Sequence, residues 1–325
     1  MRHTDIAIVG GGLAGSIAAA MLGRAGIDAI LIDPHRVYPP DFRCEKLDAD
    51  QMRVLQKTGL AEFILPVTTA NTGMWAARMG RLLDKRPNNQ RDIMYDTLVN
   101  AARSAIPEST PFLTEKVSAL QANADRQIIA LSNGEEISAR LIVLATGLNN
   151  ALRQSLGIER EVLSACHSVS IGFDMVPVGR PRFAFPALDY YAERPSDRLA
   201  YLTLFPMGSV MRANFFTYRD AHDPWLKRMR SETNDAVFEV LPNLRKIVGD
   251  FAVVGDVKIR PVDLMRVKNF RRSGVVVVGD AFATSCPAAG TGTDKVFTDV
   301  ERLCNHYIPL WLKTPGMATA KISAF

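Results

Sequence analysis

Cysteine is scarce in this chain of 325 residues, which contains only Cys44, Cys166, Cys286 and Cys304. No two of them form a C-x-x-C pair, so their spacing indicates neither a zinc site nor a redox dithiol, and we expect no bound metal. No secretory signal peptide is recognisable either. Scattered thiols without such a signal favour a reducing, cytoplasmic setting.

Runs of like charge and long membrane-spanning runs are also missing. Lys and Arg outnumber Asp and Glu by 39 to 34, and no basic run is interleaved with aromatic residues as in nucleic-acid-binding proteins. One uncharged stretch, residues 6–22, approaches the length of a membrane helix, but three successive glycines would weaken such a helix. We therefore expect no nucleic-acid partner and no integral membrane segment.

The N-terminal segment carries the most informative pattern of the chain. A short apolar run, Thr4–Val9, predicts a buried strand, and Gly10–Gly15 then matches G-x-G-x-x-G. A helical run follows at 16–24, and a second apolar strand at 28–32. This order of strand, turn, helix and strand is the context in which the motif binds a dinucleotide.

Each residue of the motif has a physical task in such a site. Gly10 would allow the tight turn, Gly12 would let the backbone approach a pyrophosphate, and Gly15 would let helix and strand pack closely. The free N–H groups at the positive end of the helix dipole would receive the phosphates. Asp33, at the end of the second strand and roughly 18 residues after Gly15, could accept hydrogen bonds from an adenosine ribose.

The next part of the chain predicts helices and strands of the same domain. A helix capped by Asp48 or Asp50 should end at Gly59, and a hairpin should turn at Met79–Gly80. Arg91 to Ala105 predicts an amphipathic helix. Further strands are expected at 116–120, 127–131 and 141–145, and the last of these runs into a glycine turn at Thr146–Gly147.

From about residue 162 to 262 the pattern changes to long alternating strands rich in aromatic residues. Strands are expected at 168–173, 182–185, 199–205 and 210–216, and a helix at 223–241. The pattern predicts a large mixed or antiparallel sheet. Its aromatic residues either fill the core of that sheet or form a flat apolar wall for a ring-shaped substrate.

A second glycine-rich turn lies near the C-terminus. Val275–Val278 predicts a buried strand that ends in Gly279–Asp280, and an aspartate in this position points into the ligand crevice of an α/β sheet. The run Pro287–Gly292 fits P-x-x-G-x-G before a helix expected at 295–305. Its bare backbone N–H groups suit a negative or electron-rich group.

Together, Gly10–Gly15 with Asp33, Leu141–Arg153 and Gly279–Leu303 resemble the FAD-dependent monooxygenases typified by p-hydroxybenzoate hydroxylase. The last segment is the most specific, because a Gly-Asp pair is followed by P-x-x-G-x-G and a helix carrying an aspartate. The resemblance implies FAD, with NADPH or NADH as reductant. It also implies hydroxylation of an aromatic or other electron-rich small molecule through a flavin C4a-hydroperoxide.

The resemblance further implies which residues contact FAD, and it names no catalytic side chain. Asp33 would bind the ribose, Asp280 the ribityl hydroxyls, and the turn after Pro287 would border the isoalloxazine ring. Arg91 would be a helix-start arginine near the ribityl chain. The full set is Gly10, Gly12, Leu13, Ala14, Gly15, Asp33, Arg43, Arg91, Val117, Thr146, Gly147, Asp280, Pro287, Gly290, Thr291, Gly292 and Thr293.

Two departures from the family pattern keep alternatives open. The middle motif reads Ala145–Thr146–Gly147 where the family carries Asp-Gly, which is closer to geranylgeranyl-reductase-like flavoproteins. This favours, as an alternative, an FAD-dependent reductase of an isoprenoid-like C=C bond. The chain also ends soon after the last expected helix, which suggests a truncated or non-catalytic flavin-binding protein. No W-x-W-x-I-P motif of flavin-dependent halogenases occurs.

The expected fold class is α/β, with a Rossmann-like FAD/NAD(P)-binding domain and an inserted, β-sheet-rich substrate domain. The nucleotide-binding domain would be discontinuous and assembled from residues 1–70, 91–160 and 262–305. Residues 71–90 and 161–261 would form the substrate domain, and residues 306–325 a short C-terminal tail.

Overall fold

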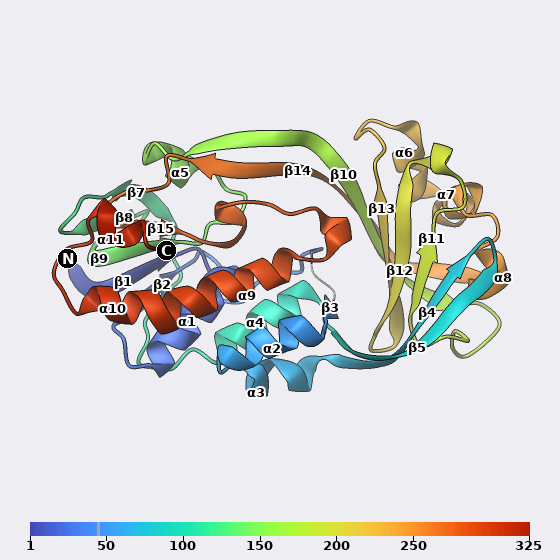
Figure 1. The fold of residues 1–325 in the computed structure, drawn as a ribbon, viewed down its shortest axis with the longest axis horizontal. Coiled ribbons are helices and arrows are strands. Elements are labelled where there is room, and N and C mark those ends of the chain that lie inside the picture. Colours follow the sequence, from blue (N-terminus) through green and yellow to red (C-terminus); the bar gives the residue numbers. More distant parts are fainter. Residues whose placement is uncertain (44–45) are drawn as a thin grey trace.

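Two β-sheets lie side by side in the protein, joined by a long two-stranded ribbon (Figure 1). The computed structural model describes residues 1–43 and 46–325, so Cys44 and Glu45 lie outside the described residues. The ribbon consists of β10 (Glu159–Pro177) and β14 (Phe251–Lys268), which pair antiparallel. Both chain termini lie on the side of the first sheet, away from the second (Figure 1).

The first sheet contains seven strands among the described residues, in the order β6-β2-β1-β9-β8-β7, and β15 also pairs with β9. β1 runs parallel to β2 and β9, and β9 parallel to β15, as in a dinucleotide-binding sheet. The strand bounds are β1 (Arg2–Val9), β2 (Ala29–Ile32), β6 (Phe112–Leu113), β7 (Val117–Gln121), β8 (Gln127–Leu131), β9 (Glu136–Leu144) and β15 (Val275–Val277).

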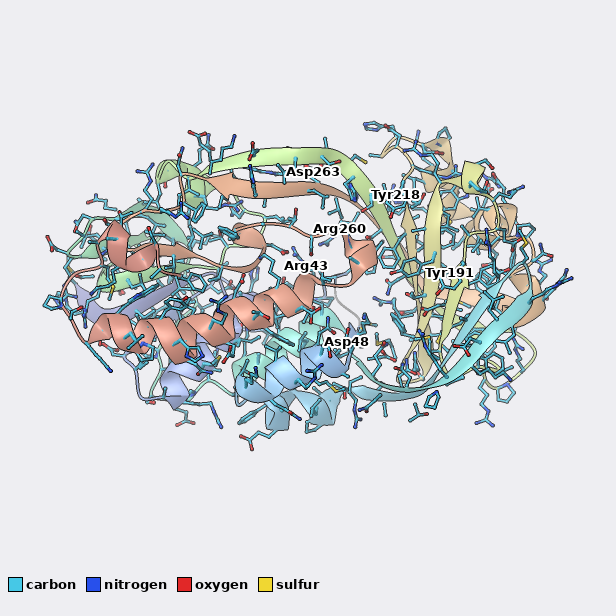
Figure 2. All side chains as sticks on the ribbon, viewed as in Figure 1. Arg43, Asp48, Tyr191, Tyr218, Arg260 and Asp263 are labelled. Carbon is cyan, nitrogen blue, oxygen red and sulfur yellow. The ribbon has the colours of Figure 1, made fainter. Side chains whose placement is uncertain are left out.

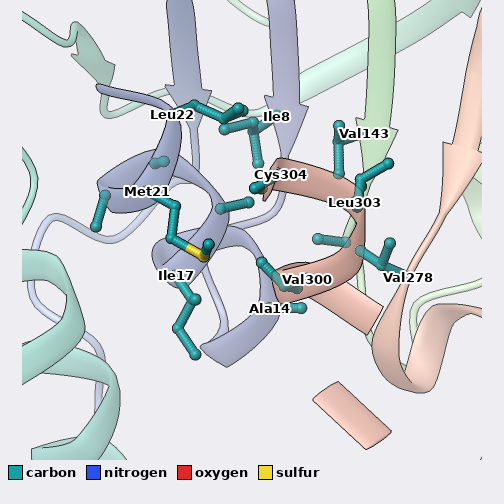
Figure 3. Close-up of a cluster of buried hydrophobic side chains, with 14 of the residues drawn as sticks. Ile8, Ala14, Ile17, Met21, Leu22, Val143, Val278, Val300, Leu303 and Cys304 are labelled. Atoms are coloured by element: carbon teal, nitrogen blue, oxygen red, sulfur yellow. The ribbon is translucent and has the colours of Figure 1, made fainter. Parts of the chain in front are cut away.

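Helices cover one face of the first sheet and bury its core there. Side chains of α1 and α9 pack against Ile8 of β1 and Val143 of β9 (Figure 3). Alternate residues of β1, Ala7 and Val9, belong to a second core on the other face, which explains why the strand reads as a continuous apolar run. The helices of this part are α1 (Leu13–Arg24), α2 (Ala49–Lys57), α3 (Ala61–Ile64), α4 (Tyr95–Ser104), α5 (Ala151–Ser155) and α9 (Gly292–Arg302).

The last residues of the chain are helical and belong to the same core. A π-helical turn at Leu303–Tyr307 continues α9 into α10 (Ile308–Leu312), and α11 (Thr319–Ile322) follows. Trp311 is buried with the helix core of the first sheet. The uncharged stretch 6–22 is divided between β1, the glycine turn and α1, and no helix in the described ranges is long and apolar enough to cross a bilayer.

The second sheet has one face covered by helices and one face turned toward the first sheet. In β12, Leu202 and Leu204 pack under α6 (Pro224–Ser231) and α7 (Thr233–Val240), with α8 (Arg245–Val248) beside them. The strand order is β14-β10-β13-β12-β11-β4-β5-β3. The remaining bounds are β3 (Lys46–Leu47), β4 (Thr69–Arg78), β5 (Arg81–Asp92), β11 (Leu188–Tyr191), β12 (Leu199–Met207) and β13 (Val210–Thr217). The expected domain boundaries stay a prediction.

The structure corrects the helix expected at Arg91–Ala105. The helix α4 begins only at Tyr95, and Arg91 lies in β5, opposite Leu47 of β3 and Ala70 of β4. Residues 91–92 are drawn into the sheet because two neighbouring strands pair with them. Arg91 is therefore not a helix-start arginine.

Two further elements differ from the expectation. Residues 182–185 form bends and no strand, since Pro181 and Pro186 flank them and proline donates no ladder hydrogen bond. The helix expected at 223–241 is two helices, because the backbone of Glu232 leaves the helical conformation between α6 and α7 (φ −138°, ψ 51°).

Asp92 is a buried carboxyl at the end of β5. It is fully buried, and its Oδ1 accepts a hydrogen bond of 2.5 Å from Gln90 Nε2. Burial raises the pKa of Asp92 to about 7. The folded protein therefore keeps a proton here that the unfolded chain releases near pH 4, so this group favours folding at low pH and loses that effect as the pH rises through about 7.

We expect Asp92→Asn to stabilise the protein at pH 8 by on the order of 2 kcal/mol and to have little effect at pH 4.5. The amide resembles the neutral carboxyl, so it removes only the cost of the buried charge. Urea unfolding at the two pH values measures the difference. Asp84→Asn, at an exposed position of the same strand, is the control. An effect of Asp92→Asn that does not depend on pH would contradict the assignment.

Candidate functional site

The first glycine turn closes as tightly as the motif requires. Gly10 has φ +99°, and a Cβ at this position would lie 2.6 Å from the carbonyl oxygen of Ala145. A Cβ on Gly15 would lie 1.8 Å from the carbonyl oxygen of Gly10. A Cβ on Gly12, by contrast, would meet no described atom within 4 Å. Gly10 and Gly15 therefore serve packing, whereas Gly12 faces open space where a ligand can approach.

The helix that follows the turn begins without a cap. Its N-cap is Gly12, which has no side chain to cap the helix, and no acidic residue lies in the first turn. The first-turn N–H groups, which include those of Leu13, Ala14 and Gly15, therefore carry the positive end of the helix dipole without compensation from an acidic side chain. This combination suits the pyrophosphate of a dinucleotide.

Asp33 lies beside the turn and holds it in place. Its Oδ2 accepts a hydrogen bond of 2.7 Å from the Gly11 N–H, and its Oδ1 accepts one of 2.9 Å from the His35 N–H. The carboxylate is therefore part of the turn itself, at the position expected for a ribose contact.

Arg103, in the last turn of α4, is a residue of this site that the sequence analysis did not identify. Its Nε donates to the carbonyl oxygen of Gly11 (3.2 Å), its Nη1 to that of Arg36 (2.9 Å), and its Nη2 lies 3.4 Å from Asp33 Oδ1. Its side chain is only 5% exposed. The sequence did contain a signal for this residue: an arginine on the apolar side of an amphipathic helix is buried, and a buried charge needs polar partners.

Asp280 follows β15 and meets Arg43 across the chain. Arg43 Nη1 lies 2.8 Å from Asp280 Oδ2, and Arg43 Nε lies 2.7 Å from Asp41 Oδ2. Asp41 also accepts a hydrogen bond of 2.6 Å from Arg260 of β14. Figure 2 shows Arg43 and Arg260 between the two sheets. The four side chains connect the first sheet to the ribbon. Burial opposes the charge of Arg43, but Tyr95, Asp41 and Asp280 outweigh it and raise its pKa.

The second glycine turn is held from both sides. Gly290 is left-handed (φ +66°), and its carbonyl oxygen accepts a hydrogen bond of 3.1 Å from Gln51 of α2. The hydroxyl of Tyr201, on β12, donates to the carbonyl oxygen of Ala288. The helix α9 starts at Gly292 with no side-chain cap hydrogen bond, which leaves its first N–H groups open. Unlike α1, however, α9 carries an acidic residue, Asp294, in its first turn.

A cavity of about 510 Å³ separates this turn from the second sheet. On the nucleotide side it is lined by Leu13, Arg43, Asp280, Pro287, Gly290, Gly292 and Thr293, all expected contacts of the flavin. On the other side it is lined by β10 to β14. The structure therefore brings seven of the expected residues to one chamber, and that chamber opens toward the inserted sheet.

The other expected residues lie in different surroundings. Gly10, Gly12, Ala14, Gly15 and Asp33 belong to the first turn and its surroundings, and Thr291 occupies the N-cap position of α9 without a side-chain hydrogen bond to the helix. Thr146 packs on Gly10, its Cα being 3.1 Å from the position of a Cβ there, and Gly147 is left-handed (φ +57°). Val117 lies in β7 at the edge of the first sheet. Arg91 differs from the others in this group, because it lies in β5 of the second sheet. Like them, it does not line the cavity.

Some aromatic residues of the second sheet fill its core, and others line the cavity as an apolar wall. Phe183, Phe185, Tyr190 and Phe215 belong to the helix-covered core. Tyr191, Tyr201, Phe205 and Phe216 line the cavity. The division follows the two-residue period of a strand, as the neighbouring pairs Tyr190–Tyr191 and Phe215–Phe216 show.

No metal site accompanies the cavity. Among the residues that the structure describes, no three His, Cys, Asp or Glu side chains gather as metal ligands. Cys166, Cys286 and Cys304 are free thiols.

Two uncapped helix starts on glycine turns, at the carboxyl ends of parallel strands, define a dinucleotide-binding protein of the α/β class. The chain matches the family described as FAD binding domain over residues 3–308, and it belongs to that family. This confirms the expected fold class, FAD as cofactor and the resemblance to FAD-dependent monooxygenases. The open space at Gly12 and the cavity at Asp280 fit this cofactor.

Relatives and solved structures agree with this family. Squalene monooxygenase of Mus musculus is 22% identical over 317 residues, which cover 91% of this chain and 53% of that protein. The chain thus spans about half the length of this relative. The 3-demethoxyubiquinol 3-hydroxylase of Escherichia coli (strain K12) is 24% identical, covering 93% and 79%. The p-nitrophenol 4-monooxygenase PnpA from Pseudomonas putida DLL-E4 shares the fold with a TM-score of 0.78 at 16% identity, covering 96% and 81%.

The glycines of the first turn can be separated experimentally. We expect Gly12→Ala to leave the unfolding temperature of the FAD-free protein unchanged and to weaken FAD binding about tenfold or more, because its methyl group enters only the space of the ligand. Gly15→Ala should instead lower the unfolding temperature, since its methyl group meets the Gly10 carbonyl. Calorimetric unfolding and FAD titration measure both. Wild-type FAD affinity of Gly12→Ala would refute the role of Gly12.

Proposed function

We propose that this protein is an FAD-dependent monooxygenase that hydroxylates an aromatic or other electron-rich small molecule, with NADPH or NADH as the reductant. One observation supports this most directly: the cavity lies between the turn at Pro287–Thr293 and a wall of aromatic side chains. A ring-shaped substrate would thus lie against the reactive face of the cofactor. We also place the protein in the cytoplasm, since its few cysteines are widely scattered, as in proteins of a reducing compartment.

The chemistry that FAD supplies when bound is two-electron oxidation and reduction and the activation of O2. The protein contributes binding and orientation. The N–H groups of Leu13, Ala14 and Gly15 would bind the pyrophosphate, Asp33 the ribose and Asp280 the ribityl chain. The open N–H groups at the start of α9, from Gly292 and Thr293, would stabilise negative charge on the ring.

The walls of the cavity would protect the reaction from water. Phe42, Phe205 and Phe216 line the cavity with apolar surface, and Phe42 lies against Gly172 of the second sheet. Excluding water limits unproductive side reactions of an oxygen-activating site. The role of each side chain in this proposal is therefore to position groups and shield them, and none has to act as a nucleophile.

The second candidate function is reduction of an isoprenoid-like C=C bond, which the turn at Thr146 favours. The Thr146 hydroxyl donates a hydrogen bond of 3.3 Å to the carbonyl oxygen of Asn149. An aspartate at this position could not donate in this way when ionised. Turnover without O2 would favour the reductase, and tightly bound FAD without any turnover would favour a non-catalytic protein.

The proposed function predicts that NADPH or NADH bleaches the visible absorbance of the FAD-loaded protein under anaerobic conditions. Stopped-flow spectroscopy follows the bleaching and then the recovery after O2 is admitted. Recovery coupled to a hydroxylated product is expected of a monooxygenase. Persistent yellow colour with both nucleotides, in the presence of phenols and of apolar ring compounds, would contradict the proposal.

The assignment of Asp280 has its own test. We expect Asp280→Ala to weaken FAD binding at least about tenfold, because a charge-assisted hydrogen bond to the ribityl chain contributes roughly 1.5–3 kcal/mol. Equilibrium dialysis of FAD measures the change. Asp256→Ala, at an exposed position of β14, is the matched control and should bind FAD as the wild type does. Unchanged affinity of Asp280→Ala would exclude Asp280 from the site.

A further inference from the structure

An apolar surface lies at the turn between β4 and β5. Met79, Leu82 and Leu83 are 51%, 40% and 59% exposed there. Figure 1 shows this end of the hairpin beside α8, on the opposite side of the molecule from both chain termini. Exposed apolar side chains that gather in one place mark interaction surfaces, whereas ones scattered singly need no explanation. We call residues 78–86 the hairpin tip.

Met79 has a backbone conformation that does not suit its residue type. Its φ is +52° and that of Gly80 is +69°, so both residues of the turn are left-handed. Such a turn favours Asn-Gly or Asp-Gly, because the Cβ and longer side chain of a methionine are disfavoured in this region. An exposed, left-handed methionine therefore costs folding stability instead of adding to it. This cost indicates a role for the side chain beyond the folded core.

Leu83 is the extra residue of a β-bulge. Ala76 lies opposite Asp84 and Ala77 opposite Leu82, so β5 has one residue more than β4 at this point. A bulge changes the direction in which the neighbouring side chains point. Bulges also protect an edge strand from pairing with another chain, but charged residues serve that purpose and a leucine does not. The bulge thus presents an apolar side chain at the same end of the hairpin as Met79.

Hydrogen bonds to the second sheet hold the backbone of the hairpin tip in place. The Gly80 N–H donates a bond of 2.9 Å to the hydroxyl of Tyr190, which in turn donates one of 2.7 Å to Glu193. Arg78 Nε donates a bond of 2.8 Å to the carbonyl oxygen of Ala192. Tyr190 is fully buried. The exposed apolar side chains therefore stand on a fixed support.

Cations surround these apolar side chains. The hairpin tip reads RMGRLLDKR and contains four cations and one carboxylate. Lys246 of α8 adds another cation, because its Cδ lies 2.6 Å from the position that a Cβ on Gly80 would take. Among the described residues, Arg81, Lys85 and Lys246 form no ion pair with a carboxylate, unlike neighbouring arginines. The hairpin tip is therefore both apolar and positively charged.

A lipid bilayer with anionic headgroups has the complementary chemistry. Apolar side chains can enter the boundary between headgroups and acyl chains, while the cations beside them stay at the level of the phosphates. Each Lys or Arg near an anionic membrane surface adds electrostatic attraction. A stable protein interface buries about 800 Å² on each partner and is centred on aromatic or arginine anchors. The end of one hairpin with three apolar side chains, none of them aromatic, fits the bilayer better.

We propose that the hairpin tip docks this protein reversibly on an anionic lipid bilayer, with Met79 and Leu83 inserted between the headgroups. The cations that face the lipid phosphates are Arg81, Lys85 and Lys246. In the docked protein the second sheet lies next to the bilayer and the first sheet lies away from it. This docking goes beyond the proposed function and does not depend on it.

The test is co-sedimentation of the FAD-loaded protein with vesicles of phosphatidylcholine, with and without about 30% phosphatidylserine. We expect binding to the anionic vesicles to be at least about fivefold tighter than to the neutral ones, and to weaken at high salt. Met79→Asn should weaken binding to the anionic vesicles about fivefold or more. Its unfolding temperature should stay equal to that of the wild type or rise, because asparagine suits the left-handed turn.

A matched pair of variants separates the hairpin tip from general surface hydrophobicity. Leu83 and Leu310 are both 59% exposed, but Leu310 lies in α10, on the side of the chain termini (Figure 1). We expect Leu83→Ser to weaken vesicle binding severalfold and Leu310→Ser to bind as the wild type does. Arg81→Gln should reduce the preference for anionic over neutral vesicles.

Several results would overturn the docking surface. These are no binding to anionic vesicles, equal binding to both kinds of vesicle, or equal losses in Leu83→Ser and Leu310→Ser. A wild-type dimer that Met79→Asn dissociates would also overturn it, since the hairpin tip would then be a protein interface. Vesicle binding requires neither reduction nor turnover, so these results leave the test of the monooxygenase independent.

Discussion

The site depends above all on how closely the first strand and the first helix approach each other. The carbonyl oxygen of Gly10 occupies the place where any side chain on residue 15 would begin. This contact fixes the direction in which α1 leaves β1 and aims its open N–H groups at the carboxyl edge of the sheet. β9 and β15 end at the same edge, so Thr146 and Asp280 are delivered there by the same parallel pairing.

The charged side chains around Arg43 connect this edge to the second sheet. Asp280 comes from the first sheet, Arg260 from the ribbon, and Asp41 and Arg43 from the loop between β2 and β3. In this group each carboxylate pairs with a guanidinium, Asp280 with Arg43 and Asp41 with Arg260. The charges at this border of the cavity therefore compensate one another. The same arrangement places Asp280 between an internal partner and the expected ribityl chain.

The sequence predicted those parts of the site that depend on neighbouring residues. Gly10–Gly15, Asp33 and the turn after Pro287 are local patterns, and their strands and helices lie where the patterns indicate. Arg91 was misplaced because strand pairing with β3 and β4 overrides a helical pattern, and pairing is not visible in a local stretch. Arg103 was missed for a related reason. Its role depends on Gly11 and Asp33, which only the tertiary fold brings next to it.

The alternation along β10 to β13 has a consequence for how such a protein can diversify. Residues of the core and residues of the cavity alternate along the same strands: Leu202 points to the helix-covered core, and its neighbour Thr203 lines the cavity. Substitutions at the cavity-facing positions can therefore change which ligand the cavity binds, while the packing on the helix-covered face stays intact. Insertions and deletions lack this freedom, because a shift of one residue would exchange the two surfaces at once. Drift in ligand preference should thus proceed by point replacement within these strands and by length changes only at their ends.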